Sequence, residues 1–149
     1  MIRMLKPGEA PPYALLLLAD PDRSVIEAYV HRSVCFVAEL ENETICACLL
    51  LAAGPDTMEI INIAVREDHQ GRGFGKRLIE HAVRYSAELG YRQMHIGTGN
   101  SSLQQLALYQ KCGFRIVGVE PDYFIKHYAE PIYENGIPCR DRIHLRKRW

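Results

Sequence analysis

Apolar and polar residues follow a strand-like pattern in the first half of the chain. Residues 34–40, 44–53 and 58–65 are rich in apolar and β-branched side chains, and short polar or Gly-Pro-containing turns separate them. Because these turns are short, we predict three antiparallel neighbouring strands. Upstream, the pattern predicts a short strand at residues 2–5 and short helices near 13–18 and 25–30.

The spacing changes to a helical period in the second half of the chain. Residues 73–89 carry a long amphipathic pattern that Gly90 ends, and a second helix is predicted at 103–111, with Ser102 and Gln105 at the spacing of a capping box. Strands are predicted around Met94 and Ile96 and at 114–119 and 142–146. Residues 121–138 have no clear period, apart from a tight turn at 134–136. We therefore predict one α/β domain over residues 1–149, with a mixed sheet that is antiparallel in its first half.

Composition narrows the classes of partner. Lys plus Arg and Asp plus Glu number 18 each, so no global charge favours nucleic acid or an anionic membrane, and neither is expected as a partner. The five cysteines are odd in number and match no disulfide or zinc framework. We expect buried, reduced thiols, no metal and a cytoplasmic protein. The apolar run at 15–19 is far too short to span a membrane, and no signal peptide is visible.

A glycine-rich segment between a strand and a helix is the strongest candidate for binding chemistry. The first amides of a helix have no partner within it, and the helix dipole adds positive charge there, so a phosphate can bind to this end. Glycines 71, 73 and 75 remove Cβ atoms from such a site, and Arg72, Lys76 and Arg77 add charge nearby. The spacing fits neither a Walker loop nor a Rossmann fingerprint. The alternative is a glycine-rich loop that only turns the chain.

Two segments together resemble the GNAT superfamily of N-acetyltransferases. Gln70-x-x-Gly73-x-Gly75, after the strand end Ile63-Ala64-Val65 and before a long helix, resembles the cofactor motif of that superfamily. Tyr109-Gln110-Lys111-Cys112-Gly113-Phe114 resembles its second motif, and one helix and one strand separate the two, as in the family. The resemblance spans about residues 33–119. It implies about six to seven strands, about four helices, and a sheet that splays between the strand ending near Val65 and the strand starting near Met94.

The resemblance also implies a cosubstrate, acetyl-CoA, and the residues that bind it. These are Ile63, Ala64 and Val65 beside the pantetheine arm and Gln70, Gly71, Arg72, Gly73, Phe74, Gly75 and Lys76 at the pyrophosphate. An amide of Ala64 or a neighbour would polarise the thioester carbonyl. Family members often carry Asn seven residues before the tyrosine. Here that position is Ser102, and Asn100 is the candidate for contact with the arm, or simply a turn residue.

Tyr109 and Glu59 are the candidate catalytic residues implied by the resemblance. Tyr109 matches the family tyrosine near the cofactor sulfur, where a protonated phenol can donate to the departing thiolate. Glu59 matches a glutamate that acts through water as a base in several members, and Asn62 is expected on the same face. Tyr109 as a packed aromatic and Glu59 as a solvated strand-end residue are the alternatives. A non-catalytic acyl-CoA-binding sensor or scaffold is the rival function.

The acceptor is the least constrained feature. Tyr123 and Tyr128 lie among acidic residues in the segment that the family motifs do not define, and such a wall would attract a cationic amine. A small-molecule amine and a protein N-terminus both remain possible acceptors, the latter because the last segments distantly resemble those of ribosomal-protein acetyltransferases. A homodimer through the C-terminal strands is a further expectation from the family.

Overall fold

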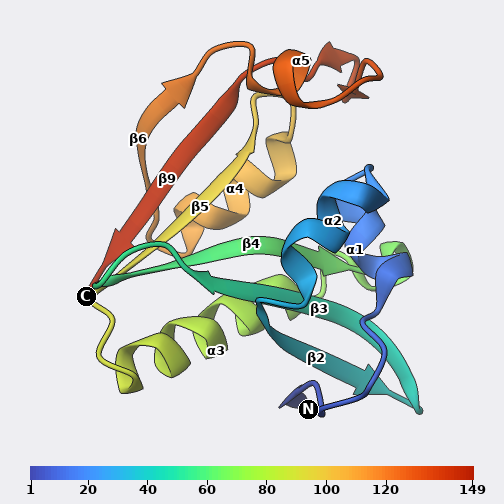
Figure 1. The fold of residues 1–149 in the computed structure, drawn as a ribbon, viewed down its shortest axis with the longest axis vertical. Helices are drawn as coiled ribbons and strands as arrows, with labels where there is room; N and C mark the ends of the chain where they lie inside the picture. Colours follow the sequence, from blue (N-terminus) through green and yellow to red (C-terminus); the bar gives the residue numbers. More distant parts are fainter.

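The computed structural model describes residues 1–149 as a central sheet with helices on both faces (Figure 1). The sheet contains, in spatial order, β1 (Ile2–Met4), β2 (Val34–Leu40), β3 (Glu43–Ala52), β4 (Thr57–Val65), β5 (Gln93–Gly99), β9 (Arg142–Arg148) and β6 (Arg115–Glu120). The helices are α1 (Tyr13–Ala19), α2 (Arg23–Val30), α3 (Phe74–Glu88), α4 (Leu103–Lys111), α5 (Tyr123–His127) and the 3-10 turn η1 (Glu67–His69). A separate hairpin joins β7 (Tyr133–Glu134) to β8 (Ile137–Pro138).

The predicted α/β fold with a mixed, mostly antiparallel sheet is confirmed. Strands β2, β3 and β4 are antiparallel neighbours, and only the β4–β5 pair is parallel. Helix α5 falls in the segment without a clear hydrophobic period, because its five residues are too few to establish one. In the β7–β8 hairpin, positive φ angles at Asn135 and Gly136 form the expected tight turn.

The sheet splays between β4 and β5, as the family resemblance implied. The two strands pair only from Thr57–Gln93 to Ile60–Ile96, and beyond this point β4 pairs with β3 alone while β5 continues beside β9. The β3–β4 register shifts by one residue here, which leaves Ile61 as the extra residue of a β-bulge. A bulge bends its strand, so the opening and the bulge occur together.

Two hydrophobic cores fill the two faces of the sheet. The larger core joins β2–β5 and β9 to α3 and α4, and includes Leu78, Ile79, Met94 and Leu145. The smaller core lies beneath α1 and α2 on β2, β3 and β4, and farther along this face α5 packs against the start of β9, where Tyr123 meets Arg142 (Figure 1).

The cysteines are free thiols, as their odd number and their spacing predicted. All five cysteines are free; Cys112 is half-buried and the other four are buried. No group of three or more metal-ligating side chains lies together. None of the helices combines the length and the apolar character that a membrane-spanning helix needs.

Candidate functional site

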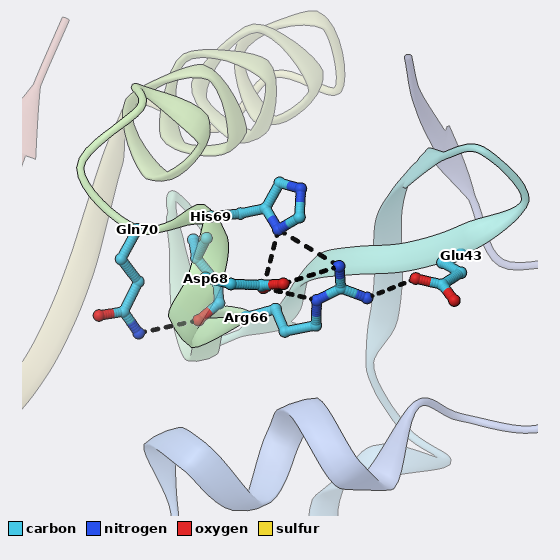
Figure 2. A network of polar contacts seen from close by, with 6 residues as sticks. Glu43, Arg66, Asp68, His69 and Gln70 are labelled. Atoms are coloured by element: carbon cyan, nitrogen blue, oxygen red, sulfur yellow. Dashed lines mark hydrogen bonds and ion pairs between the residues drawn. The ribbon is translucent and has the colours of Figure 1, made fainter.

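A network of charged side chains holds the turn that leads from β4 into α3 (Figure 2). Arg66 donates to Glu43 at 2.8 Å and to Asp68 at 2.7 Å, and His69 Nδ1 lies 2.8 Å from the same Asp68. Gln70 donates from its amide to the Val65 carbonyl at 2.9 Å. Hydrogen bonds from Arg66 and His69 hold the pKa of Asp68 well below its usual range. These contacts therefore hold the backbone of residues 66–70 in place just before the glycine-rich segment.

The segment that follows presents six consecutive free amides. The backbone N–H groups of residues 71–76 donate to no group of the protein, and the first bond of α3 runs from the Arg77 N–H to the Gly73 carbonyl. These amides occupy the N-terminal end of a 15-residue helix, where the helix dipole is positive. No acidic side chain lies in the first turn. This arrangement is a site for an anion such as a pyrophosphate.

The three glycines of this segment have two different roles. Gly71 (φ 76°) and Gly73 (φ 87°) adopt the left-handed conformation that side chains other than glycine rarely accept. Gly75 has an ordinary φ, but a Cβ there would approach the Leu108 side chain of α4 to 3.0 Å. Gly75 therefore allows α3 to start close to α4, which carries Tyr109.

Beside the amides, β4 offers an unpaired edge. Arg66 N–H bonds to the Ile45 carbonyl across the β3 ladder. Since the backbone groups of successive residues alternate in direction, the Ala64 amide faces β3, and the amides of Ile63 and Val65 face the opening. Of the predicted residues 63–65, the neighbours of Ala64 are thus the ones with amides available to a ligand.

Tyr109 lies in α4 with its ring in the larger core, 3 % exposed. Its hydroxyl makes no hydrogen bond within the protein and is not among the fully buried polar atoms that lack a partner, of which Asn62 Oδ1 is the only one. Burial, with smaller contributions from Cys48 and Cys112, holds the pKa of Tyr109 well above its usual value of 10. The hydroxyl is therefore a protonated donor with nothing in the protein to donate to.

Glu59 is a paired carboxylate on the face of the sheet opposite Tyr109. Its Oε2 accepts from the Arg142 guanidinium at 3.0 Å and lies 3.5 Å from His95 Nδ1. Burial alone would raise the pKa of Glu59, but His95 and Arg142 outweigh it and hold the pKa below 4.5. Its side chain is 18 % exposed. The alternative of a fully solvated strand-end glutamate is thereby excluded.

A buried polar chain joins Asn62 to Tyr128. Asn62 donates from Nδ2 to Tyr29 Oη at 3.0 Å and to the Leu16 carbonyl at 3.1 Å. Asp20 accepts from the Tyr29 hydroxyl at 3.2 Å and from the Tyr128 hydroxyl at 3.0 Å. Burial raises the pKa of Asp20 despite these bonds. The chain ties the segment after α5 to the helices α1 and α2.

The expected common face of Glu59 and Asn62 depends on the bulge. Strict alternation would place residues three apart on opposite faces. The extra residue Ile61 restores Asn62 to the face of Glu59, where α1 and α2 lie. Tyr123 reaches the same region, because the Arg142 guanidinium lies over its ring at 5.0 Å from the centroid. Of the three predicted acceptor residues, Tyr123 therefore lies against the arginine that pairs with Glu59, whereas Asn62 and Tyr128 belong to the polar chain through Tyr29 and Asp20.

Two predicted polar roles are replaced by contacts with distant segments. The Asn100 side chain accepts from the amides of Arg140 and Asp141 and donates to the Pro138 carbonyl, so it secures the chain before β9. This is the turn role rather than a free amide directed at a cofactor. Ser102 is at the N-cap of α4 but makes no capping bond, and its hydroxyl donates to Glu134 at 2.8 Å.

Four polar residues of this region were not singled out by the sequence: Asp20, His95, Arg142 and His144. The Arg142 guanidinium lies flat against Gly97, where any side chain would collide with it. The one available signal was the alternation in β9, which places Arg142 and His144 opposite the inward-facing Ile143 and Leu145. That pattern predicts a half-exposed strand and does not identify partners.

Comparison with known proteins agrees with this geometry. The model of the acetyltransferase (GNAT) family matches residues 6–114. Over 133 residues the chain is 49 % identical to the uncharacterized N-acetyltransferase YvbK of Bacillus subtilis (strain 168), covering 89 % of this chain and 86 % of YvbK.

Two solved structures are similar over nearly their whole length. One is an IAA acetyltransferase from Bacillus cereus ATCC 14579, with 50 % identity, a TM-score of 0.96 and coverage of 100 % of this chain and 99 % of that one. The other is a GNAT family acetyltransferase from Elizabethkingia anophelis with acetyl-CoA bound, with 41 % identity, a TM-score of 0.96 and coverage of 100 % and 97 %. The family predicted from the two motifs is confirmed: this chain belongs to the GNAT family of acetyltransferases.

Proposed function

We propose that this protein transfers an acetyl group from acetyl-CoA directly to a primary amine, with both substrates bound in a ternary complex. The observation that carries the proposal is the run of six free amides at residues 71–76 beside the unpaired edge of β4. The similar protein from Elizabethkingia anophelis was solved with acetyl-CoA bound, which supports this choice of donor.

The donor would bind mainly to the backbone. Its pyrophosphate fits the amides of Gly71 to Lys76, with the side chains of Arg72 and Lys76 adding positive charge. The pantetheine arm would lie along the open edge of β4 as an added strand, bonded to Ile63 and Val65. One of these two amides would also stabilise the oxyanion that forms when the amine attacks the thioester. Asn100 is not part of this proposed contact set, because its side chain is already used.

Tyr109 is the proposed general acid. When the tetrahedral intermediate collapses, the carbon–sulfur bond breaks and the thiolate leaves with the electron pair. The Tyr109 hydroxyl has no competing acceptor and stays protonated at neutral pH, so it is suited to donate to that sulfur. The phenolate would then regain its proton from solvent through the opening.

Glu59 is the proposed base, acting through a water molecule. An aliphatic amine arrives mostly as the ammonium ion, and it must lose a proton before it can attack. The lowered pKa of Glu59 keeps it ionised, and Arg142 fixes its orientation. Such a carboxylate attracts the cation strongly but holds a proton weakly, so the proton must move onward.

The acceptor site would form around Glu59 from both halves of the chain. Asn62 Oδ1 is buried without a partner and is an acceptor suited to an N–H donor. Tyr123 and Tyr128 add an aromatic wall that would favour a cationic group. These residues suit a primary amine, on a small molecule or at a protein N-terminus. A homodimer through the C-terminal strands remains a prediction from the family.

The test is a screen for CoA thiol release with acetyl-CoA and a panel of polyamines, aminoglycosides, amino acids and short peptides. We expect turnover on at least one amine class, with an acetylated product detected by mass spectrometry. Tight binding of acetyl-CoA without turnover on any acceptor would reject the proposal and support the rival, a non-catalytic acyl-CoA-binding module. Glu59→Gln provides the matched chemical control, because it should retain donor binding.

A further inference from the structure

Four side chains form a continuous row across four neighbouring strands of the sheet. Glu59 in β4 lies 3.5 Å from His95 Nδ1 in β5. His95 Nε2 lies 2.8 Å from His144 Nδ1 in β9, and His144 Nε2 lies 3.3 Å from Glu120 in β6. Each imidazole therefore uses both ring nitrogens, and a carboxylate stands at each end of the row.

The strand register accounts for this alignment. Glu59 and His95 are direct partners in the parallel β4–β5 pair. Both cross-strand neighbours of His144 are glycines, Gly97 in β5 and Gly118 in β6. The Arg142 guanidinium occupies the space over Gly97, and the His144 ring extends beside it to His95 on one side and Glu120 on the other. The two rings lie 5.0 Å apart between centroids with an interplanar angle of 31°.

Exposure increases along the row. The side chains of Glu59, His95, His144 and Glu120 are 18 %, 22 %, 26 % and 48 % exposed. The row thus leads from the proposed acceptor site to bulk solvent without a break.

The surroundings of His144 favour its neutral form. Burial lowers the pKa of His144, and although Glu120 opposes this effect, Arg142 and His95 add to it. Arg146 is the direct cross-strand neighbour of His95 and has no carboxylate partner. Neutral imidazole is the form that can accept a proton at one nitrogen and release another.

We propose that His95, His144 and Glu120 form a relay that carries to solvent the proton that Glu59 removes from the amine. The inference rests on the proposed role of Glu59. His95 and His144 act through Glu59 and are therefore positioning and relay residues that do not touch the substrate.

The proton balance of the relay is complete. In its receiving state, His95 Nδ1 bears a lone pair toward Glu59, while His95 Nε2–H donates to His144 Nδ1 and His144 Nε2–H donates to Glu120. A proton passes from Glu59 to His95 Nδ1, the Nε2 proton moves to His144 Nδ1, and the His144 Nε2 proton passes to Glu120 and then to water. Glu59 is left ionised, and both imidazoles now carry their proton on Nδ1. Each ring returns to the Nε2–H tautomer by gaining a proton at Nε2 and losing one from Nδ1 to water before the next turnover. The 3.5 Å step is the longest of the three, and such contacts commonly tighten when substrate binds.

The test compares His144→Asn with His81→Asn under steady-state turnover. His81 is the matched control because it is also a half-buried histidine whose pKa is lowered by burial, but it lies in α3 against Phe36, away from the row. We expect His144→Asn to lower kcat about tenfold at low buffer concentration, a partial loss of a general-base contribution, with KM for acetyl-CoA unchanged. His81→Asn should leave kcat unchanged.

Rescue separates a relay from a structural role. Added imidazole should restore much of the lost kcat in His144→Gly, because a free base can occupy the space that the His144 ring leaves and take the proton from His95. Restoration should increase with the concentration of neutral imidazole and therefore with pH. A structural loss would not respond to a soluble base.

Two outcomes distinguish failure of the relay from failure of the proposed function. If the wild-type protein turns over an amine and His144→Asn matches His81→Asn at every pH and buffer concentration, the relay is wrong while the proposed function stands. If the wild-type protein acetylates no acceptor, the proposed function fails and the relay fails with it.

Discussion

The donor end and the acceptor face of this site are built from different parts of the chain. The donor end consists of backbone amides within one continuous stretch, residues 63–76, and it depends on φ angles and on a helix terminus. The proposed acceptor face consists largely of side chains from separate strands, and its paired residues Glu59 in β4 and Arg142 in β9 are 83 residues apart in the sequence. A site built from backbone amides tolerates most side-chain substitutions but not the replacement of a glycine that needs a positive φ. A site built from side chains is disrupted when one of those side chains is replaced. Mutations can therefore separate the two regions.

Tyr109→Phe should give the largest effect, because it removes the one hydroxyl proposed to protonate the thiolate. We expect kcat to fall on the order of 1,000-fold, within the range for loss of a general acid. Since the hydroxyl bonds to no protein group, the melting temperature and the affinity for acetyl-CoA should stay near wild type. Steady-state kinetics and thermal unfolding measure both.

Tyr85→Phe is the control for this substitution. Tyr85 lies in α3 and packs edge-on against Phe36 of β2. The Tyr85 hydroxyl likewise has no hydrogen-bond partner. It should behave as wild type in both assays. Equal kcat for Tyr109→Phe and wild type would show that Tyr109 is only a packed aromatic.

Glu59→Gln is expected to lower kcat/KM for the amine on the order of 100-fold, because an amide can neither take the proton nor attract the ammonium ion. KM for acetyl-CoA should not change, since the backbone amides bind the donor. Glu39→Gln is the control, because Glu39 is also paired with an arginine, Arg3, but on the distant strand β2. A normal rate for Glu59→Gln at all pH values would assign the base to another group.

Gly73→Ala should weaken acetyl-CoA binding about tenfold while kcat at saturation stays high. A residue with a Cβ at φ 87° costs roughly 1–2 kcal/mol, so the loop relaxes and its amides lose their alignment. Gly8→Ala imposes the same strain at φ 83°, also with no atoms near the new Cβ. Both variants should lose similar stability, and only Gly73→Ala should raise KM for acetyl-CoA. If the two variants have the same KM, the glycine only turns the chain.

The smallest effect concerns stability and pH. The pKa of Glu59 is lower in the folded protein than its ordinary 4.5, so its pairing with Arg142 and His95 stabilises the fold fully above pH 4.5. That contribution, about 1 kcal/mol for a partly buried pair, disappears as the pH falls through the lower folded-state pKa. Urea unfolding of wild type and Glu59→Gln should differ at pH 7 and converge in acid. A constant difference would mean that the ionised carboxylate is not the source.

The two regions differ in how well they could be predicted, because one is built from a continuous segment and the other from distant strands. Three features are local patterns: the glycines between residues 70 and 75, the helix after them, and the Tyr109–Phe114 motif. The family, the α/β fold and the proposed donor end could therefore be predicted from the sequence. Strict alternation could not place Asn62 on the face of Glu59, because the Ile61 bulge depends on the β3–β4 register. Local capping rules predicted that Ser102 would bond its own helix, but Glu134, 32 residues away, takes its hydroxyl instead.

Local sequence patterns could not predict the row of Glu59, His95, His144 and Glu120 either. No spacing rule links four residues on four strands, and the order β4-β5-β9-β6 is needed before they become neighbours. Asn100 illustrates the reverse case, since its place near the family asparagine suggested the donor, whereas the chain before β9 uses its side chain.

The most direct test of the donor end is a titration of isotope-labelled protein with CoA, followed by amide chemical shifts. We expect the largest shifts at the amides of residues 71–76 and at Ile63 and Val65, while Ala64, bonded to β3, shifts less and Gly8 does not move. The histidine row on the acceptor face should change little without an amine. Saturable CoA binding that leaves the amides of residues 71–76 unshifted would contradict the account.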